Sequence, residues 1–157
     1  MGNILIVCTA NICRSPVVEA LLRLKLDHAG YQAWQVYSAG TWVEESRRAS
    51  RYSVELLSEL KGIDISLHRS RLATPKLVRD ADLVIVMTAS HAEVLQIENP
   101  SQRDKIVMLS QLAYDGRRID VQDPYGGPKE EYRIMFDSVS SQIDAAFDRI
   151  ISMVSKP

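Results

Sequence analysis

The sequence predicts an α/β fold, namely a single doubly wound domain with a four-stranded parallel sheet flanked by helices. Two observations favour this class. Short apolar runs alternate with longer segments whose apolar residues recur every three or four positions, as strands and helices do in turn. The runs at residues 4–7 and 83–87 lack polar alternation, which is typical of strands covered on both faces of a parallel sheet. We therefore expect the functional site at the carboxyl ends of the strands.

Length and composition bound the class of protein. The 157 residues suffice for one domain, residues 1–157, with a substantial core. The net charge of −1 leaves no basic surface for nucleic acid, and no apolar run approaches the roughly 20 residues of a membrane span. No basic segment of a signal peptide is visible. Two neighbouring cysteines fit a reducing compartment better than a disulfide scaffold, so we expect a cytoplasmic protein.

Apolar periodicity places the elements in order. The expected strands lie at residues 4–7, 34–38, 82–87 and 106–109, and the expected helices at residues 16–28, 52–61, 75–80, 91–98 and 130–153, with a long loop at 110–129. Capping signals support the helix ends. Ser15 and Pro16 form an N-cap and first-turn pair, and Thr74 precedes a first-turn proline. Ser90 opens a Ser-x-x-Glu capping box, and Gly62 is a stop signal.

The connection between the first strand and the first helix carries the most chemistry. Cys8 ends the strand, and Arg14 follows after five intervening residues. A loop before a helix N-terminus directs backbone N–H groups and the positive end of the helix dipole at one small volume. This field favours thiolate over thiol, and the planar guanidinium of Arg14 can hold two phosphoryl oxygens. Ser15 can donate a hydrogen bond to the sulfur. The pattern indicates thiolate attack on phosphorus inside an anion-binding loop.

The motif Cys-x5-Arg-Ser after a strand closely resembles the phosphate loop of the low-molecular-weight protein tyrosine phosphatase family. The family's pattern continues with Ser-Ala-Gly-Thr at residues 38–41, Gly-Ile-Asp leading to His68, and Asp-Pro-Tyr at residues 123–125. The resemblance implies a phosphatase without cofactor or metal, in which Cys8 and Arg14 are catalytic. The implied phosphate-binding loop further contains Thr9, Ala10, Asn11, Ile12, Cys13 and Ser15.

The resemblance also implies a brace around this loop. In the family, a serine supports the loop in a network with the loop Asn and a downstream His, which correspond here to Ser38, Asn11 and His68. The physical need is clear, because a loop with many inward N–H groups must be held open from outside. His68 is then a bracing residue and not a catalytic base.

A thiolate that attacks a phosphate ester needs an acid to protonate the leaving oxygen. Asp123 is the candidate, because the following proline stiffens the loop and restricts the backbone of Asp123. The Asp-Pro pair also resembles the general-acid loop of the family. Asp120 is the nearest rival, and Asp115 is a more distant one. We expect a phosphocysteine on Cys8, which Asp123 then helps to hydrolyse by activating water.

Two aromatic residues and Ile12 bear on the substrate. Trp42 and Tyr125 are expected to flank the cleft and enclose an aromatic ring. A phosphate at the end of a tyrosine reaches a buried thiol, whereas phosphoserine is too short. Family members that act on phosphoarginine carry Thr at the position of Ile12, which favours phosphotyrosine here. We expect a phosphotyrosine-containing protein as substrate; a protein arginine phosphatase is the alternative.

Two further loop residues give hypotheses. The spacing of Cys13 from Cys8 suggests a reversible disulfide that mild peroxide would form and that would protect Cys8 from over-oxidation. Ala10 stands where the family usually has Gly. Alanine is harmless there if its φ is negative and costs free energy if its φ is positive.

Other classes fit the residues less well. Arsenate reductases share the fold and the loop, but their disulfide relay needs a further cysteine pair, and no cysteine follows Cys13. A non-catalytic phosphate or phosphotyrosine binder would need neither Asp123 nor a reactive thiol. A nucleotide-binding P-loop is excluded because no Gly-Lys-Ser/Thr follows the first strand.

Overall fold

The computed structural model describes residues 1–156, so Pro157, the last residue of the predicted domain, lies outside the described residues. The strands of its sheet are β1 (Asn3–Cys8), β2 (Gln35–Gly40), β3 (Leu83–Val86) and β4 (Ile106–Met108). Their spatial order is β2-β1-β3-β4, and every neighbouring pair is parallel. In the centre, Ile6 lies between Ser38 of β2 and Ile85 of β3. The predicted four-stranded parallel sheet is confirmed.

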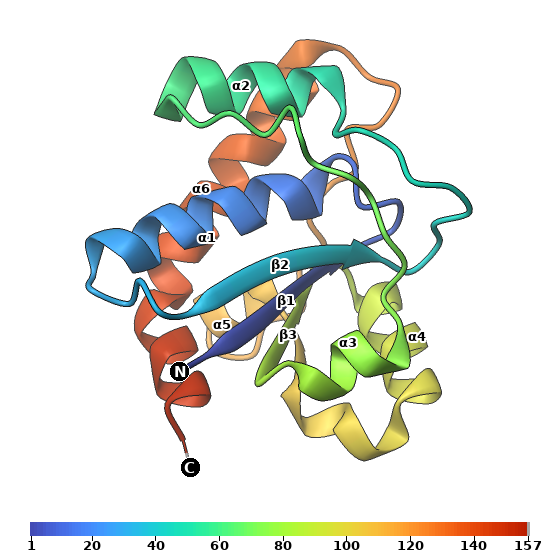
Figure 1. Cartoon of the computed structure of the whole chain (residues 1–157), viewed down its shortest axis with the longest axis vertical. Helices are drawn as coiled ribbons and strands as arrows, with labels where there is room; N and C mark the ends of the chain where they lie inside the picture. The colour runs from blue at the N-terminus through green and yellow to red at the C-terminus, as the bar shows by residue number, and fades with distance from the viewer. Residues whose placement is uncertain (157) are drawn as a thin grey trace.

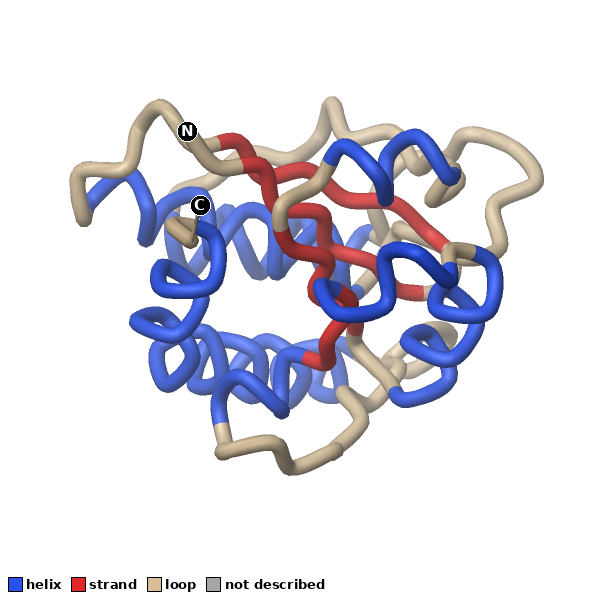
Figure 2. The backbone as a smooth tube through the Cα atoms, turned by 90° about the horizontal axis from the view of Figure 1, so that it is seen from below, coloured by secondary structure: helices blue, strands red, loops and turns tan. Residues whose placement is uncertain are grey.

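Helices cover both faces of this sheet (Figure 1). They are α1 (Arg14–His28), α2 (Arg51–Lys61), α3 (Pro75–Asp80), α4 (Ala89–Glu98), the short α5 (Leu109–Ala113), α6 (Lys129–Val154) and a 3₁₀ helix, η1 (Pro100–Lys105). One hydrophobic core joins α1, α2, α5 and α6 to one face, and a second core joins α3 and α4 to the other. Figure 2 shows the strands running between the two groups of helices. The fold is therefore doubly wound, as predicted.

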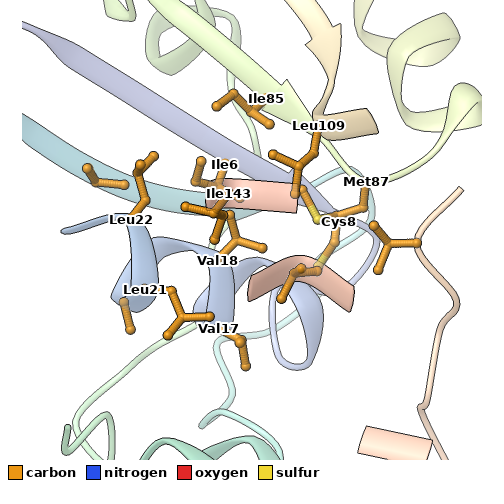
Figure 3. Packing of buried hydrophobic residues seen from close by; sticks show 14 of the residues in the cluster. Ile6, Cys8, Val17, Val18, Leu21, Leu22, Ile85, Met87, Leu109 and Ile143 are labelled. Atoms are coloured by element: carbon orange, nitrogen blue, oxygen red, sulfur yellow. The ribbon is translucent and has the colours of Figure 1, made fainter. Parts of the chain in front are cut away.

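The central strand β1 supplies side chains to both cores. Ile4, Ile6 and Cys8 belong to the core on the α1 and α6 side, whereas Leu5 and Val7 belong to the core on the α3 and α4 side. This alternation follows from the two-residue period of a strand. In the close view of the first core, Cys8 lies among the packed side chains at the end of the strand (Figure 3). Burial on both faces explains the uninterrupted apolar run in the sequence.

The sheet order creates a switch point between β1 and β3. The chain leaves β1 for α1 on one face, and it leaves β3 for α4 on the opposite face. In open α/β sheets, ligands bind in the crevice outside the carboxyl ends of such strands. Cys8 is the last residue of β1, so the fold places its thiol at this crevice.

The structure corrects three local predictions. Helix α1 begins at Arg14 after Cys13, so Ser15 lies inside the helix and is not its N-cap. Helix α4 begins one residue before Ser90, with Thr88 as the N-cap residue whose side chain accepts a hydrogen bond from the first turn. Residues 109–113, expected to lie mostly in a loop, form α5, which packs against α6. Helix α5 has only five residues, too few for a clear helical period in the sequence.

The other end signals are confirmed. The Thr74 hydroxyl accepts a hydrogen bond from Leu77 N at 3.2 Å, and Gly62 ends α2 in the left-handed region with a φ of 65°. Within residues 1–156, no helix combines the length and the apolar character needed to cross a bilayer.

Candidate active site

The loop between β1 and α1 keeps its N–H groups unpaired. None of the backbone N–H groups of residues 9–13 donates to a carbonyl group within residues 1–156. The carbonyl oxygens of Cys8, Thr9 and Ile12 instead accept bonds of 2.9, 3.0 and 2.8 Å from the N–H groups of Thr41, Trp42 and Ser50. Gly40 permits this close approach, because a Cβ there would overlap the Thr9 carbonyl oxygen. The free donors ahead of a helix N-terminus form an anion site.

Cys8 lies at the start of this loop, 2% exposed. Its Sγ atom is 3.0 Å from the hydroxyl of Ser15. The Ser15 oxygen already accepts a hydrogen bond from Asn11 Nδ2 at 2.8 Å, so the hydroxyl hydrogen is left for the sulfur. A hydrogen bond from Ser15 stabilises a negative charge on the Cys8 sulfur.

The predicted bracing residues meet at Asn11. Its φ of 59° is left-handed, a conformation that Asn tolerates better than most residues. Asn11 Nδ2 also donates to Ser38 Oγ at 2.9 Å, and His68 Nε2 donates to the Asn11 carbonyl at 2.7 Å. Arg71 completes the set, because its backbone N–H donates to Asn11 Oδ1 at 3.1 Å. These contacts hold the loop from outside. The bracing role of Asn11, Ser38 and His68 in the reaction stays a prediction.

Arg14 is 4% exposed and is held at both of its terminal nitrogens. Nη1 donates to the Val121 carbonyl at 3.0 Å, and Nη2 donates to Thr9 Oγ1 at 3.3 Å. The buried Nε has no partner within residues 1–156. A buried charged donor without a partner costs folding free energy. An anion bound in the loop would satisfy Nε.

Asp123 lies opposite the loop, with one carboxylate oxygen 3.6 Å from Arg14 Nη2. Its side chain is 49% exposed, and its other oxygen accepts a hydrogen bond from Tyr125 N at 3.1 Å. The rivals are engaged elsewhere. Asp120 accepts a hydrogen bond from Ala89 N at the start of α4, and Asp115 pairs with Arg149. Among these three carboxylates, only Asp123 lines the hollow at Cys8.

The hollow at Cys8 has a volume of about 260 Å³. Its lining comprises Cys8, Thr9, Ala10, Ile12, Cys13, Arg14, Arg47, Asp123 and Tyr125. Tyr125 lines this hollow, and its contact with a substrate ring stays a prediction. Trp42, which is 70% exposed, lines a neighbouring hollow of about 290 Å³ instead, and Arg47 lines both. The sequence predicted that both aromatic residues would enclose one substrate ring, but of the two only Tyr125 lines this hollow.

The two loop hypotheses have different outcomes. Ala10 is not among the residues with positive φ within residues 1–156, so alanine fits this position without backbone strain. Both cysteines are free thiols, and the protective disulfide stays a prediction. Cys13 Sγ lies 2.9 Å from Ser50 Oγ and 3.4 Å from Tyr132 OH. Burial raises the pKa of the Cys13 thiol, which keeps it protonated.

Sequence reasoning missed residues that reach the site from distant segments. His91 is 5% exposed, and its Nε2 lies 2.8 Å from Thr9 Oγ1. Burial, reinforced by the positive charge of Arg14, lowers the pKa of His91 to about 4. The available signal was its place just after a buried strand, which shares a sheet edge with the end of β1. Arg47 gave no signal, because it lies in an irregular polar segment.

Comparison with known proteins agrees with this geometry. The family model described as low molecular weight phosphotyrosine protein phosphatase matches residues 3–156. A protein-arginine-phosphatase of Geobacillus stearothermophilus is 35% identical over 148 residues, covering 94% of this chain and 95% of the relative. A probable low molecular weight protein-tyrosine-phosphatase, EpsP, of Ralstonia nicotianae is 33% identical over the same shares of the two chains.

Solved structures give the same result. A low molecular weight protein tyrosine phosphatase from T. tengcongensis superposes with a TM-score of 0.88 at 36% identity, covering 95% of this chain and 99% of the other. The YwlE arginine phosphatase from Geobacillus stearothermophilus has a TM-score of 0.85 at 33% identity, covering 97% of this chain and 94% of the other. The sequence pattern, the sheet order and the loop geometry therefore have one explanation: this chain belongs to the low molecular weight phosphotyrosine protein phosphatase family.

Proposed function

We propose that this protein is a phosphatase that hydrolyses phosphotyrosine in proteins through a phosphocysteine on Cys8. The observation that carries the proposal is the placement of Cys8 in a hollow with unpaired loop N–H groups, Arg14 and Asp123. We also propose that the whole chain acts as one domain and works in the cytoplasm, as its length and its free thiols favour.

The reaction has two displacements. In the first, Cys8 Sγ forms a bond to phosphorus while the bond to the leaving oxygen breaks, and protonated Asp123 gives its proton to that oxygen. In the second, Asp123 takes a proton from water, the water oxygen bonds to phosphorus, and Cys8 leaves as a thiolate. Arg14 and the loop N–H groups stabilise the charge that spreads over the phosphoryl oxygens in both steps. Ser15 stabilises the departing sulfur.

The walls of the hollow favour an aromatic substrate. Ile12 lines it with a side chain that can accept no hydrogen bond, and Tyr125 adds an aromatic face at the rim. A phosphotyrosine ring presents only apolar atoms to these walls. The guanidinium of phosphoarginine would bring N–H donors against Ile12, and each unpaired donor costs about 1–3 kcal/mol. The similarity to arginine phosphatases nevertheless makes phosphoarginine the necessary comparison.

The substrate prediction can be tested by replacing Ile12. We expect the wild type to hydrolyse a phosphotyrosine peptide with kcat/KM at least about tenfold above that for the matched phosphoarginine peptide, which corresponds to one lost hydrogen bond. The variant Ile12→Thr should narrow or invert this ratio, because its hydroxyl can accept from a guanidinium. Phosphate release in buffer with chelator measures both rates, and Ile12→Val is the control of similar shape.

A wild-type preference for phosphoarginine would overturn the substrate assignment and leave the two-step mechanism intact. Binding of phosphotyrosine without turnover of either peptide would overturn the catalytic proposal, in favour of a binding module.

The general-acid prediction separates Asp123 from its neighbour. We expect Asp123→Asn to lower kcat/KM for phosphotyrosine by roughly 10²–10⁴-fold, because asparagine cannot protonate the leaving oxygen. The loss should shrink for an aryl phosphate with an acidic leaving group, which departs without a proton. Asp120→Asn is the matched control, since its amide oxygen can still accept from Ala89 N. Equal losses in the two variants, or a loss that is independent of the leaving group, would contradict the role of Asp123.

A further inference from the structure

We infer that His91 is a positioning residue for the reaction, which acts through the Thr9 hydroxyl to hold Arg14 and to aim a further hydrogen-bond donor at the phosphoryl group. This inference rests on the proposed function, since it assigns two more side chains to the same anion site. Within residues 1–156, the His91 side chain hydrogen-bonds to Thr9 and does not line the hollow at Cys8. Its effect on substrate is therefore transmitted by Thr9.

His91 itself is fixed by the start of α4. Its backbone N–H donates to the Thr88 hydroxyl at 3.2 Å, and the neighbouring Ala89 N–H donates to Asp120 at 2.9 Å. The side chain is 5% exposed. A rotamer locked by burial and by a capped first turn gives a rigid point of attachment, which a side chain on a mobile loop could not provide.

Thr9 joins His91 to Arg14. The Thr9 hydroxyl oxygen lies 2.8 Å from His91 Nε2 and accepts from Arg14 Nη2 at 3.3 Å. Thr9 also lines the hollow at Cys8. Without this hydroxyl, the partner of Nη2 within residues 1–156 would be the Asp123 carboxylate at 3.6 Å, which we propose to act as the general acid. The Thr9 oxygen thus holds Nη2 of the guanidinium, while the Val121 carbonyl holds Nη1.

The hydrogen bonds at Thr9 favour one tautomer of His91. If His91 Nε2 carries the ring hydrogen, the Thr9 oxygen accepts two bonds and its own hydrogen is free for a phosphoryl oxygen. His91 Nδ1, which has no hydrogen-bond partner within residues 1–156, is then an acceptor without a hydrogen. In the other tautomer, Nδ1–H would be a buried donor without a partner, which is the rarer and costlier defect in proteins. We therefore assign the ring hydrogen to Nε2.

Burial of His91 favours the neutral ring that this arrangement needs. Of the charged groups around it, Arg14 lowers the pKa of His91 further, whereas Asp120 and Asp123 raise it. Burial and the Arg14 charge together hold the pKa of His91 near 4, so the imidazole is uncharged at neutral pH. A second cation beside Arg14 is thereby avoided.

Thr9 offers the sharpest test, because its side chain is exposed and its replacement does not disturb the core. We expect Thr9→Val and His91→Leu each to weaken binding of inorganic phosphate, measured by calorimetry, and to lower kcat/KM for p-nitrophenyl phosphate, by about tenfold. Thr9→Ser keeps the hydroxyl and should stay within about twofold of the wild type. The double variant should lose no more than either single variant, because both interrupt the same chain of hydrogen bonds.

Two controls separate positioning from stability. Glu93→Gln changes an exposed residue of the same helix and should leave phosphate binding unchanged. Melting temperatures show whether His91→Leu only loosens the fold, and if that variant does not fold, the pair Thr9→Val and Thr9→Ser decides alone. Losses that multiply to about a hundredfold in the double variant, or a Thr9→Val variant equal to the wild type, would overturn the inference. A wild type that binds phosphate but hydrolyses no ester would instead overturn the proposed function, while the binding data still report on His91.

Discussion

Replacement of Cys8 by serine is expected to lower kcat for phosphotyrosine by at least about 10⁴-fold, the size of loss seen when an enzyme loses its nucleophile. In the proposed mechanism a thiolate makes the bond to phosphorus, and a serine hydroxyl at the same place is a far weaker nucleophile without an adjacent base. Ser15, whose hydroxyl lies 3.0 Å from Sγ, is a hydrogen-bond donor to the sulfur and not a base. The anion site itself is unaltered, so inorganic phosphate should still bind to Cys8→Ser.

The neighbouring thiol provides the matched control. Cys13 lines the same hollow, but it faces Ser50 and Tyr132, and burial raises its pKa. We therefore expect Cys13→Ser to keep turnover within about tenfold, since its polar partners can accommodate a hydroxyl. Acid quenching followed by mass spectrometry should find the phosphoryl group on Cys8 in the wild type. A phosphoryl group on Cys13, or turnover that survives in Cys8→Ser, would contradict the assignment.

The sequence predicted best those parts of the molecule in which the local residue pattern reflects the tertiary packing. Residues 4–7 are apolar throughout because both faces of β1 are covered, so the pattern already contained the two-layered packing. The phosphate loop could be placed because its function fixes its spacing. Asn11 takes a left-handed backbone and joins Ser38 and His68 to the loop, and few other residues can do both.

The sequence could not rank competing caps or find distant partners. Thr88 and Ser90 are both good N-cap residues, and their hydroxyls lie 3.0 Å apart, so only the tertiary setting of α4 decides between them. His91 meets Thr9 across 82 positions of sequence. That contact depends on the strand order β2-β1-β3-β4, which brings the ends of β1 and β3 together. The sequence shows that His91 follows a buried strand, but it does not show that this strand lies directly beside β1.

Trp42 illustrates a different limit. The sequence indicated an aromatic wall, but Trp42, whose N–H donates to the Thr9 carbonyl, lines the hollow beside the one at Cys8. Its indole N–H then donates to Glu44 at 3.3 Å, within its own segment. The residue type predicted a role in recognition. Which hollow Trp42 lines depends instead on the path of the segment 41–50, which has neither helix nor strand.

Replacement of Arg14 by lysine is the second change with a large expected effect, a loss of roughly 10³-fold in kcat/KM. Charge is retained, so the loss would come from geometry. Arg14 uses Nη1 for Val121, Nη2 for Thr9, and leaves Nε for the phosphoryl group. A lysine ammonium has three donors on one atom, so it cannot occupy these three separated positions at once. Affinity for inorganic phosphate should fall by more than about tenfold.

Arg47→Lys is the control for this prediction, because Arg47 lines the same hollow but lies exposed on its rim. With its charge kept and its side chain exposed, Arg47→Lys should stay within about threefold of the wild type.

Arg14→Lys also tests how the segment that carries Asp123 is held. The Arg14–Val121 hydrogen bond ties the segment before Asp123 to the phosphate loop. Arg14→Lys should therefore lower the rate and also steepen its dependence on the leaving group, because the acid is then less well placed. If Arg14→Lys retained more than a tenth of the activity, charge alone would suffice, and the planar fork would not be the reason for an arginine at this position.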